Sequence, residues 1–170
     1  MTTVARISWL EIDKYYNLLR SQKKDSKIWE FLEKYPISRN DFKELVKRGW
    51  KVSKELEYDF GRLDRKNLKI LIRKDLIPGY ERDVTLFHEI GHIFYENIDN
   101  SLSESENEII VEWTARKART NHILLRNAIN CFGLEPAIYD LPSCRAYTKI
   151  RSKSLENIFT KTMMEDLVIN

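Results

Sequence analysis

The pentapeptide His88-Glu89-Ile90-Gly91-His92 follows the pattern H-E-x-x-H and lies near the middle of the chain. Residues four apart share one face of an α-helix, so both imidazoles can point to the same place, with Glu89 beside them. The chain has three histidines, and two of them are in this stretch. This arrangement is typical of a helix that binds zinc. The alternative is a solvated helix that carries two histidines by chance.

We predict that this helix covers about residues 84–96. Pro78-Gly79 indicates a turn before it, and Asp83 is suited to cap its first turn. Gly91 lies inside the helix, where glycine costs about 1 kcal/mol relative to alanine. We therefore expect the backbone to pack closely against a neighbour at Gly91.

A catalytic zinc ion needs three protein ligands and one position open to water. We expect the third ligand from a long helix over about residues 104–133, which follows a polar loop and ends at Gly133. Four glutamates in the first part of that helix are close to the pentapeptide in sequence: Glu104, Glu106, Glu108 and Glu112. Glu108 and Glu112 are four residues apart, so they share a face and both can approach the metal.

We predict His88, His92 and Glu112 as the zinc ligands. Glu112 leaves a longer loop in which the chain can reverse, and Ala115 one turn later would let the two helices pack closely. Glu108 would then accept a hydrogen bond from the second ring nitrogen of an imidazole. The reverse assignment stays open, as does a solvent-facing role for either glutamate. His122 would lie roughly 15 Å beyond Glu112 on a continuous helix, and we expect it to be a partly buried structural residue.

Glu89 is predicted as the catalytic base and not as a ligand. Zinc lowers the pKa of a bound water from about 15.7 to about 7, and Glu89 is placed to take the proton and pass it to the leaving amine. Tyr95, Tyr147 and Arg145 are the candidates for stabilising the oxygen that becomes negatively charged in the transition state. Together these roles predict hydrolysis of a peptide bond.

The rest of the chain predicts an α+β fold that is mostly helical. Ser8-x-x-Glu11 and Ser38-x-x-Asp41 are capping boxes that begin helices, and a further helix is expected over residues 26–34. A last amphipathic helix is expected from Ser154 onward. We expect one domain over residues 1–170, with N-terminal helices (1–52), a core that carries the pentapeptide (53–133) and a C-terminal segment (134–170).

Alternating apolar residues predict a small antiparallel sheet or hairpin before the pentapeptide. Leu56, Tyr58 and Phe60 alternate with acidic residues, residues 61–67 are polar and rich in turn formers, and residues 68–72 alternate again. The second strand, over residues 68–74, could present an open edge to an extended peptide; a strand that only covers the core is the alternative.

Composition indicates a soluble cytoplasmic protein. Apolar residues make up 42% of the chain, charged residues 32%, and the formal net charge is +3. We find no apolar run long enough to span a membrane and no apolar stretch of a signal peptide in residues 1–12. Lys and Arg are interleaved with Asp and Glu along most of the chain, and the basic stretch over residues 145–153 is one exception. We therefore do not expect nucleic acid as a partner.

From about residue 56 to residue 118 the chain resembles the ImmA/IrrE family of metallopeptidases. The resemblance lies in the strand Leu68-Lys69-Ile70-Leu71-Ile72, a loop with an arginine, the stretch from Thr85 to His92, and a following helix rich in glutamate. It implies a compact zincin-like fold, zinc held by His88, His92 and a downstream glutamate, and Glu89 as base. In the family's second motif a glutamate is followed directly by alanine, whereas residues 108–115 are EIIVEWTA here.

The sequence therefore predicts a zinc metallopeptidase that cleaves a specific intracellular protein. The family resemblance implies a repressor or another transcriptional regulator as the substrate. A non-catalytic zinc-binding module that holds a protein partner is the main alternative. A DNA-binding regulator that uses the basic stretch after Arg145 is a third reading, and its DNA affinity would depend steeply on salt.

Overall fold

The computed structural model describes residues 7–137, which contain six helices and a three-stranded sheet. This is the mostly helical α+β fold that the sequence predicted. In chain order the elements are α1 (Trp9–Gln22), α2 (Lys27–Lys34), α3 (Arg39–Lys47), β1 (Lys51–Leu56), β2 (Gly61–Asp64), β3 (Lys69–Arg73), α4 (Tyr80–Tyr95), α5 (Glu104–Thr120) and α6 (His122–Phe132).

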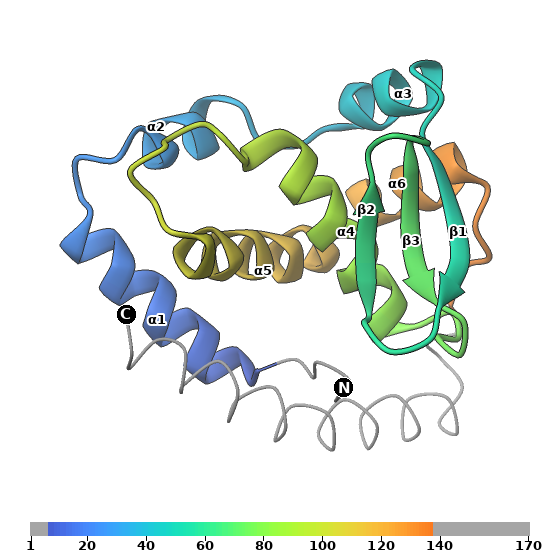
Figure 1. Ribbon diagram of the computed structural model, residues 1–170, viewed down its shortest axis with the longest axis horizontal. Helices are drawn as coiled ribbons and strands as arrows, with labels where there is room; N and C mark the ends of the chain where they lie inside the picture. Colours follow the sequence, from blue (N-terminus) through green and yellow to red (C-terminus); the bar gives the residue numbers. More distant parts are fainter. Residues whose placement is uncertain (1–6, 138–170) are drawn as a thin grey trace.

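Helices α4 and α5 pack on each other in the middle of the molecule (Figure 1). The sheet lies to one side of them, where α4 contacts β2 and β3, and α1 packs on α5 on the other side. Helix α6 contacts both α3 and α5. Buried apolar side chains form two main clusters, one around α3, β3, α4 and α6, the other around α1, α2 and α5. In residues 7–137 no helix combines the length and the apolar character that a membrane span requires.

Short-range capping signals fix most helix starts. The Ser8 side chain accepts a hydrogen bond from the Glu11 backbone N–H at the start of α1. Ser38 and Asp41 form a capping box at the start of α3, as the sequence predicted. Ser103 forms another with Glu106 at the start of α5. These bonds satisfy backbone N–H groups that have no partner inside the helix.

The sheet is mixed, and the predicted pairing is only partly correct. Strand β3 coincides with the predicted second strand and pairs with β2 as an antiparallel hairpin, but β1 joins its other side in parallel, giving the order β1-β3-β2. Tyr58 and Phe60, predicted in a strand, lie in the turn between β1 and β2, which an Asp59–Arg62 ion pair of 2.8 Å closes. The predicted open edge of β3 is wrong, because β3 is the central strand.

Helix α4 begins about one turn earlier than predicted. Its N-cap is Gly79, and Asp83, which was expected to cap it, is fully buried within the first turns. The Asp83 carboxylate accepts a hydrogen bond of 3.0 Å from the Arg82 guanidinium and lies 3.8 Å from Arg119 of α5. The polar stretch that local patterns assign to the preceding loop is therefore the first turn of α4.

The predicted long helix over residues 104–133 is two helices. The chain breaks at Asn121, whose side chain accepts a hydrogen bond of 3.1 Å from the Leu124 N–H and caps α6. Because α6 has its own direction, His122 is exposed instead of partly buried. Gly133 ends α6 in the left-handed conformation (φ 65°), as predicted. The helix predicted from Ser154 lies outside the described residues.

Candidate metal centre

The site is built where α4 and α5 pack against each other. Gly91 of α4 faces α5, and a Cβ atom built on it would lie 3.1 Å from Val111 Cγ1. Val111 and Ala115 are almost completely buried in this interface. The close packing expected at Gly91 is therefore confirmed, and it brings the carboxylates of α5 within reach of the imidazoles of α4.

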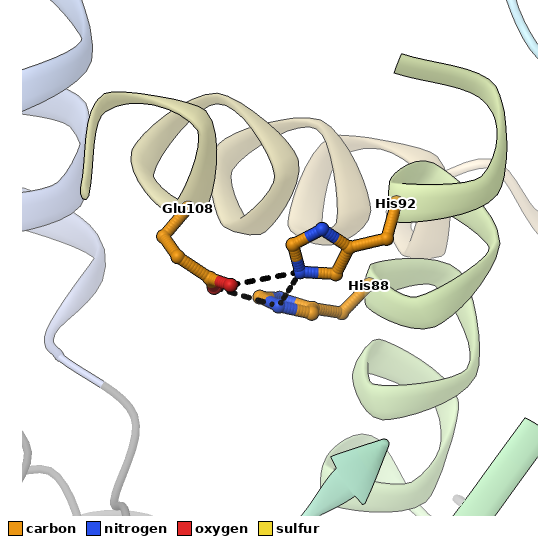
Figure 2. Close-up of side chains that lie close together, drawn as sticks. All are labelled: His88, His92 and Glu108. Atoms are coloured by element: carbon orange, nitrogen blue, oxygen red, sulfur yellow. Dashed lines mark hydrogen bonds and ion pairs between the residues drawn. The ribbon is translucent and has the colours of Figure 1, made fainter. Parts of the chain in front are cut away.

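Two imidazoles from α4 and one carboxylate from α5 converge on a single point (Figure 2). The Nε2 atoms of His88 and His92 lie 3.0 Å apart. One oxygen of Glu108 lies 3.0 Å from Nε2 of His88, and the other lies 2.9 Å from Nε2 of His92. The potential ligand atoms of the three residues lie within 4.8 Å of one another.

Glu112, predicted as the third ligand, binds the opposite side of the His88 ring. Its Oε1 lies 2.8 Å from Nδ1 of His88, and its Oε2 accepts a hydrogen bond of 2.7 Å from Nε of Arg116. The structure thus exchanges the positions that the sequence analysis expected for Glu108 and Glu112 around the imidazoles. The two carboxylates are one helical turn apart on the same face, and the crossing of α4 and α5 decides which ring nitrogen each one reaches.

His92 is supported in a similar way by a residue that the sequence analysis missed. Its Nδ1 lies 3.1 Å from Oε1 of Glu96, which follows it by one helical turn. Arg65, in the turn between β2 and β3, forms an ion pair with Glu96. The four-residue spacing was a signal for Glu96, whereas nothing local indicated Arg65.

The carboxylates dominate the electrostatics of the centre. Burial disfavours a proton on His88, but Glu108 and Glu112 outweigh it and raise the pKa of this imidazole to about 10. For Glu108, burial favours the neutral acid, but His88 and His92 outweigh it and hold the pKa of the carboxyl far below its usual range. Negative charge is therefore concentrated where the two Nε2 atoms meet, and protons and divalent cations compete for these nitrogens.

The donor set fits zinc. Two imidazole nitrogens and one carboxylate oxygen are common protein ligands of a catalytic zinc ion. Ligands about 2.0–2.1 Å from a tetrahedral ion lie roughly 3.3 Å from each other, close to the 3.0 Å that separates the two Nε2 atoms. Glu108 offers a different oxygen to each imidazole, at 3.0 and 2.9 Å. Each imidazole also has a carboxylate at its Nδ1, the arrangement that fixes the orientation and tautomer of metal-bound histidines.

Glu89, the predicted base, lies on α4 with its side chain buried. It is not among the grouped ligand atoms, and it packs against the beginning of β2, where an added Cβ on Gly61 would lie 2.9 Å from its Oε1. The helix thus turns the imidazoles toward α5 and Glu89 toward the sheet edge.

The other predicted site residues lie elsewhere. Tyr95 is buried in the cluster around α1, α2 and α5, where its ring meets Phe31 edge-on, and burial raises the pKa of its phenol. Tyr147 and Arg145 lie outside the described residues. His122 takes no part in the metal group, as expected.

Comparison of the chain with models of protein families, with curated protein sequences and with solved structures gave no match. The side chains of α4 and α5 therefore carry the functional assignment.

Proposed function

We propose that the protein is a zinc-dependent metallopeptidase in which His88, His92 and Glu108 hold the metal and Glu89 is the catalytic base. One observation carries this proposal: two Nε2 atoms one helical turn apart meet a carboxylate from a second helix at separations of 2.9–3.0 Å. Three protein ligands leave a further coordination position for water or substrate, as catalytic zinc sites require.

Zinc bound at these three residues would act as a Lewis acid and bring the pKa of a coordinated water to about 7. The protein residues have separate tasks. Glu89 accepts a proton from the attacking water at a carboxylate oxygen and later donates it to the nitrogen of the leaving amine. Glu112 and Glu96 hold the His88 and His92 rings through Nδ1, so that both Nε2 atoms keep facing Glu108.

The outer edge of β2 is the proposed docking place for an extended substrate. Within residues 7–137, β2 pairs with β3 alone, so its other edge is where a further strand could add. β2 also contacts α4 and begins beside Glu89. Main-chain hydrogen bonds to this edge would place a peptide bond close to the base without demanding a particular sequence.

A protein inside the cell is the proposed substrate, with a transcriptional regulator as the first candidate. This choice comes from the resemblance to the ImmA/IrrE family, which stays a prediction. Glu108 has 36% of its side chain accessible, against 15% for His88 and 11% for His92. The carboxylate is therefore the part of this group that a substrate can approach most easily.

The first test separates metal binding from catalysis. Glu89→Gln removes the base but no ligand, so we expect zinc content to persist and peptide cleavage to fall by about 100-fold or more. Cleavage is measured on a peptide library by mass spectrometry, and zinc by elemental analysis. His88→Ala should lose both zinc and cleavage. Glu104→Gln, the same change at an exposed position of α5, is the matched control and should keep both.

Equal cleavage by the wild type and Glu89→Gln would rule out Glu89 as the catalytic base. Retained zinc with no cleavage in the wild type would favour the non-catalytic zinc-binding module instead.

A further inference from the structure

The first residue of β2 comes unusually close to the predicted base. A Cβ atom built on Gly61 would lie 2.9 Å from Oε1 and 3.0 Å from Cγ of Glu89, and 2.7 Å from Cγ2 of Thr85. Contacts below 3.0 Å are not tolerated by real Cβ atoms, so any side chain at this position forces a neighbour to move.

The backbone itself does not call for glycine at Gly61. Positive φ angles occur at Gly49 and Gly133, where a side chain would be strained, but not at Gly61. As part of a strand paired with β3, it has a conformation that any residue adopts. The effect of having no side chain at Gly61 is therefore to leave space for the Glu89 side chain.

The strand cannot easily withdraw to make that space. Gly61 pairs with Ile72 of β3, and the carbonyl of the preceding Phe60 accepts a hydrogen bond of 2.9 Å from the Arg73 N–H. The Phe60 ring is buried under the Arg73 guanidinium, 4.5 Å from its centroid. These contacts fix the start of β2 relative to the sheet.

Thr85 is also held in place. Its hydroxyl donates a hydrogen bond of 2.7 Å to the Glu81 carbonyl, which points its methyl group at Gly61. The Glu89 side chain has more rotatable bonds than Thr85, and its carboxylate is the part that can rotate away. A methyl group at Gly61 would thus be accommodated mainly by displacing that carboxylate.

We propose that Gly61 is a positioning residue for catalysis: its missing side chain lets the edge strand of the sheet approach α4 and still leaves the Glu89 carboxylate in its working orientation. This inference rests on the proposed function, in which Glu89 is the base. It also links two parts of the site, because the strand proposed to dock the substrate is the one that fixes the base.

The test uses the full-length zinc-loaded protein and three variants: Gly61→Ala, Thr85→Ser and the double variant. Thr85→Ser removes the nearer contact and keeps the hydroxyl. For Gly61→Ala we expect kcat to fall about 10- to 100-fold, because a displacement of roughly 1 Å can cost that much. KM and zinc affinity should change less than about threefold, since Gly61 contacts none of the three ligands. Thr85→Ser should retain wild-type kcat.

The double variant distinguishes the two neighbours. Its kcat should stay low, because the contact with Glu89 Oε1 remains. A return to the wild-type kcat would mean that Gly61 only accommodates Thr85, and the inference would be overturned. Wild-type kcat in Gly61→Ala alone would overturn it as well.

A second measurement does not depend on turnover. Acetohydroxamic acid chelates zinc and must give up its hydroxyl proton, which a nearby carboxylate accepts. We expect its dissociation constant, measured by calorimetry, to rise about 10-fold in Gly61→Ala and Glu89→Gln but not in Thr85→Ser. If the wild type binds zinc but cleaves nothing, the peptidase proposal fails while this measurement still decides the role of Gly61. Unchanged binding in Gly61→Ala would refute that role.

Discussion

At the scale of single residues, three carboxylates contact the four ring nitrogens of His88 and His92. Glu108 faces both Nε2 atoms, while Glu112 and Glu96 each take one Nδ1. Of these two α5 carboxylates, Glu108 is the more accessible: 36% of its side chain is exposed, against 5% for Glu112. In the proposed function, the metal ligand and the buried group that orients an imidazole would thus lie on successive turns of one helix.

This division predicts unequal losses of zinc affinity. Glu112→Gln keeps an oxygen for the His88 Nδ1–H, and we expect the zinc dissociation constant to rise about 10- to 100-fold. Glu108→Gln replaces a charged ligand oxygen by a neutral one and should cause a clearly larger rise. Competition with a chromophoric chelator measures both. A larger effect of Glu112→Gln would return the ligand role to Glu112, and Glu104→Gln again serves as the control.

At the scale of elements, the packing of α4 on α5 sets the distance between the imidazoles of α4 and the carboxylates of α5. Gly91 allows this contact, since Val111 Cγ1 occupies the space where a Cβ would lie 3.1 Å away. Val111 is 1% exposed and cannot move into solvent. Overpacking of this kind typically costs about 1–3 kcal/mol, which outweighs the roughly 1 kcal/mol that alanine gains over glycine in a helix.

We therefore expect Gly91→Ala to lower the free energy of unfolding by up to about 2 kcal/mol and to weaken zinc binding by pushing α5 away from α4. Adding Val111→Ala provides room for the new methyl group. In a double-mutant cycle followed by urea denaturation, the two changes should cost less together than the sum of their separate costs. Strict additivity would show that the two side chains do not meet.

At the scale of the whole molecule, the centre is connected to the beginning of the described chain. Arg116 donates one hydrogen bond to Glu112 and another to the backbone carbonyl of Ile7, just before α1. Arg116, Glu112 and Ile7 are all buried. The seating of α1 on α5 and the orientation of the His88 ring therefore depend on the same guanidinium group.

Arg116→Met should affect both properties. Breaking a buried ion pair from one side typically costs about 3–5 kcal/mol of stability, and losing the support of Glu112 should weaken zinc binding by about 10- to 100-fold. Arg73→Met is the matched control: Arg73 is equally buried and pairs with Asp75, but it touches no metal-site residue. It should destabilise the protein and leave zinc affinity unchanged. Wild-type zinc affinity in Arg116→Met would contradict the connection.

Local chemistry in the sequence determined the starts of α1, α2, α3 and α5, the strand β3, the end of α6 at Gly133 and the two imidazoles on one helical face. Capping boxes, alternation and the four-residue repeat all act between residues close in the chain, so they can be recognised without the fold. Only the tertiary structure decided the parallel pairing of β1, the break at Asn121, and which of Glu108 and Glu112 lies beside both Nε2 atoms. These features depend on contacts between elements that are far apart in the sequence, and local sequence patterns do not specify such contacts.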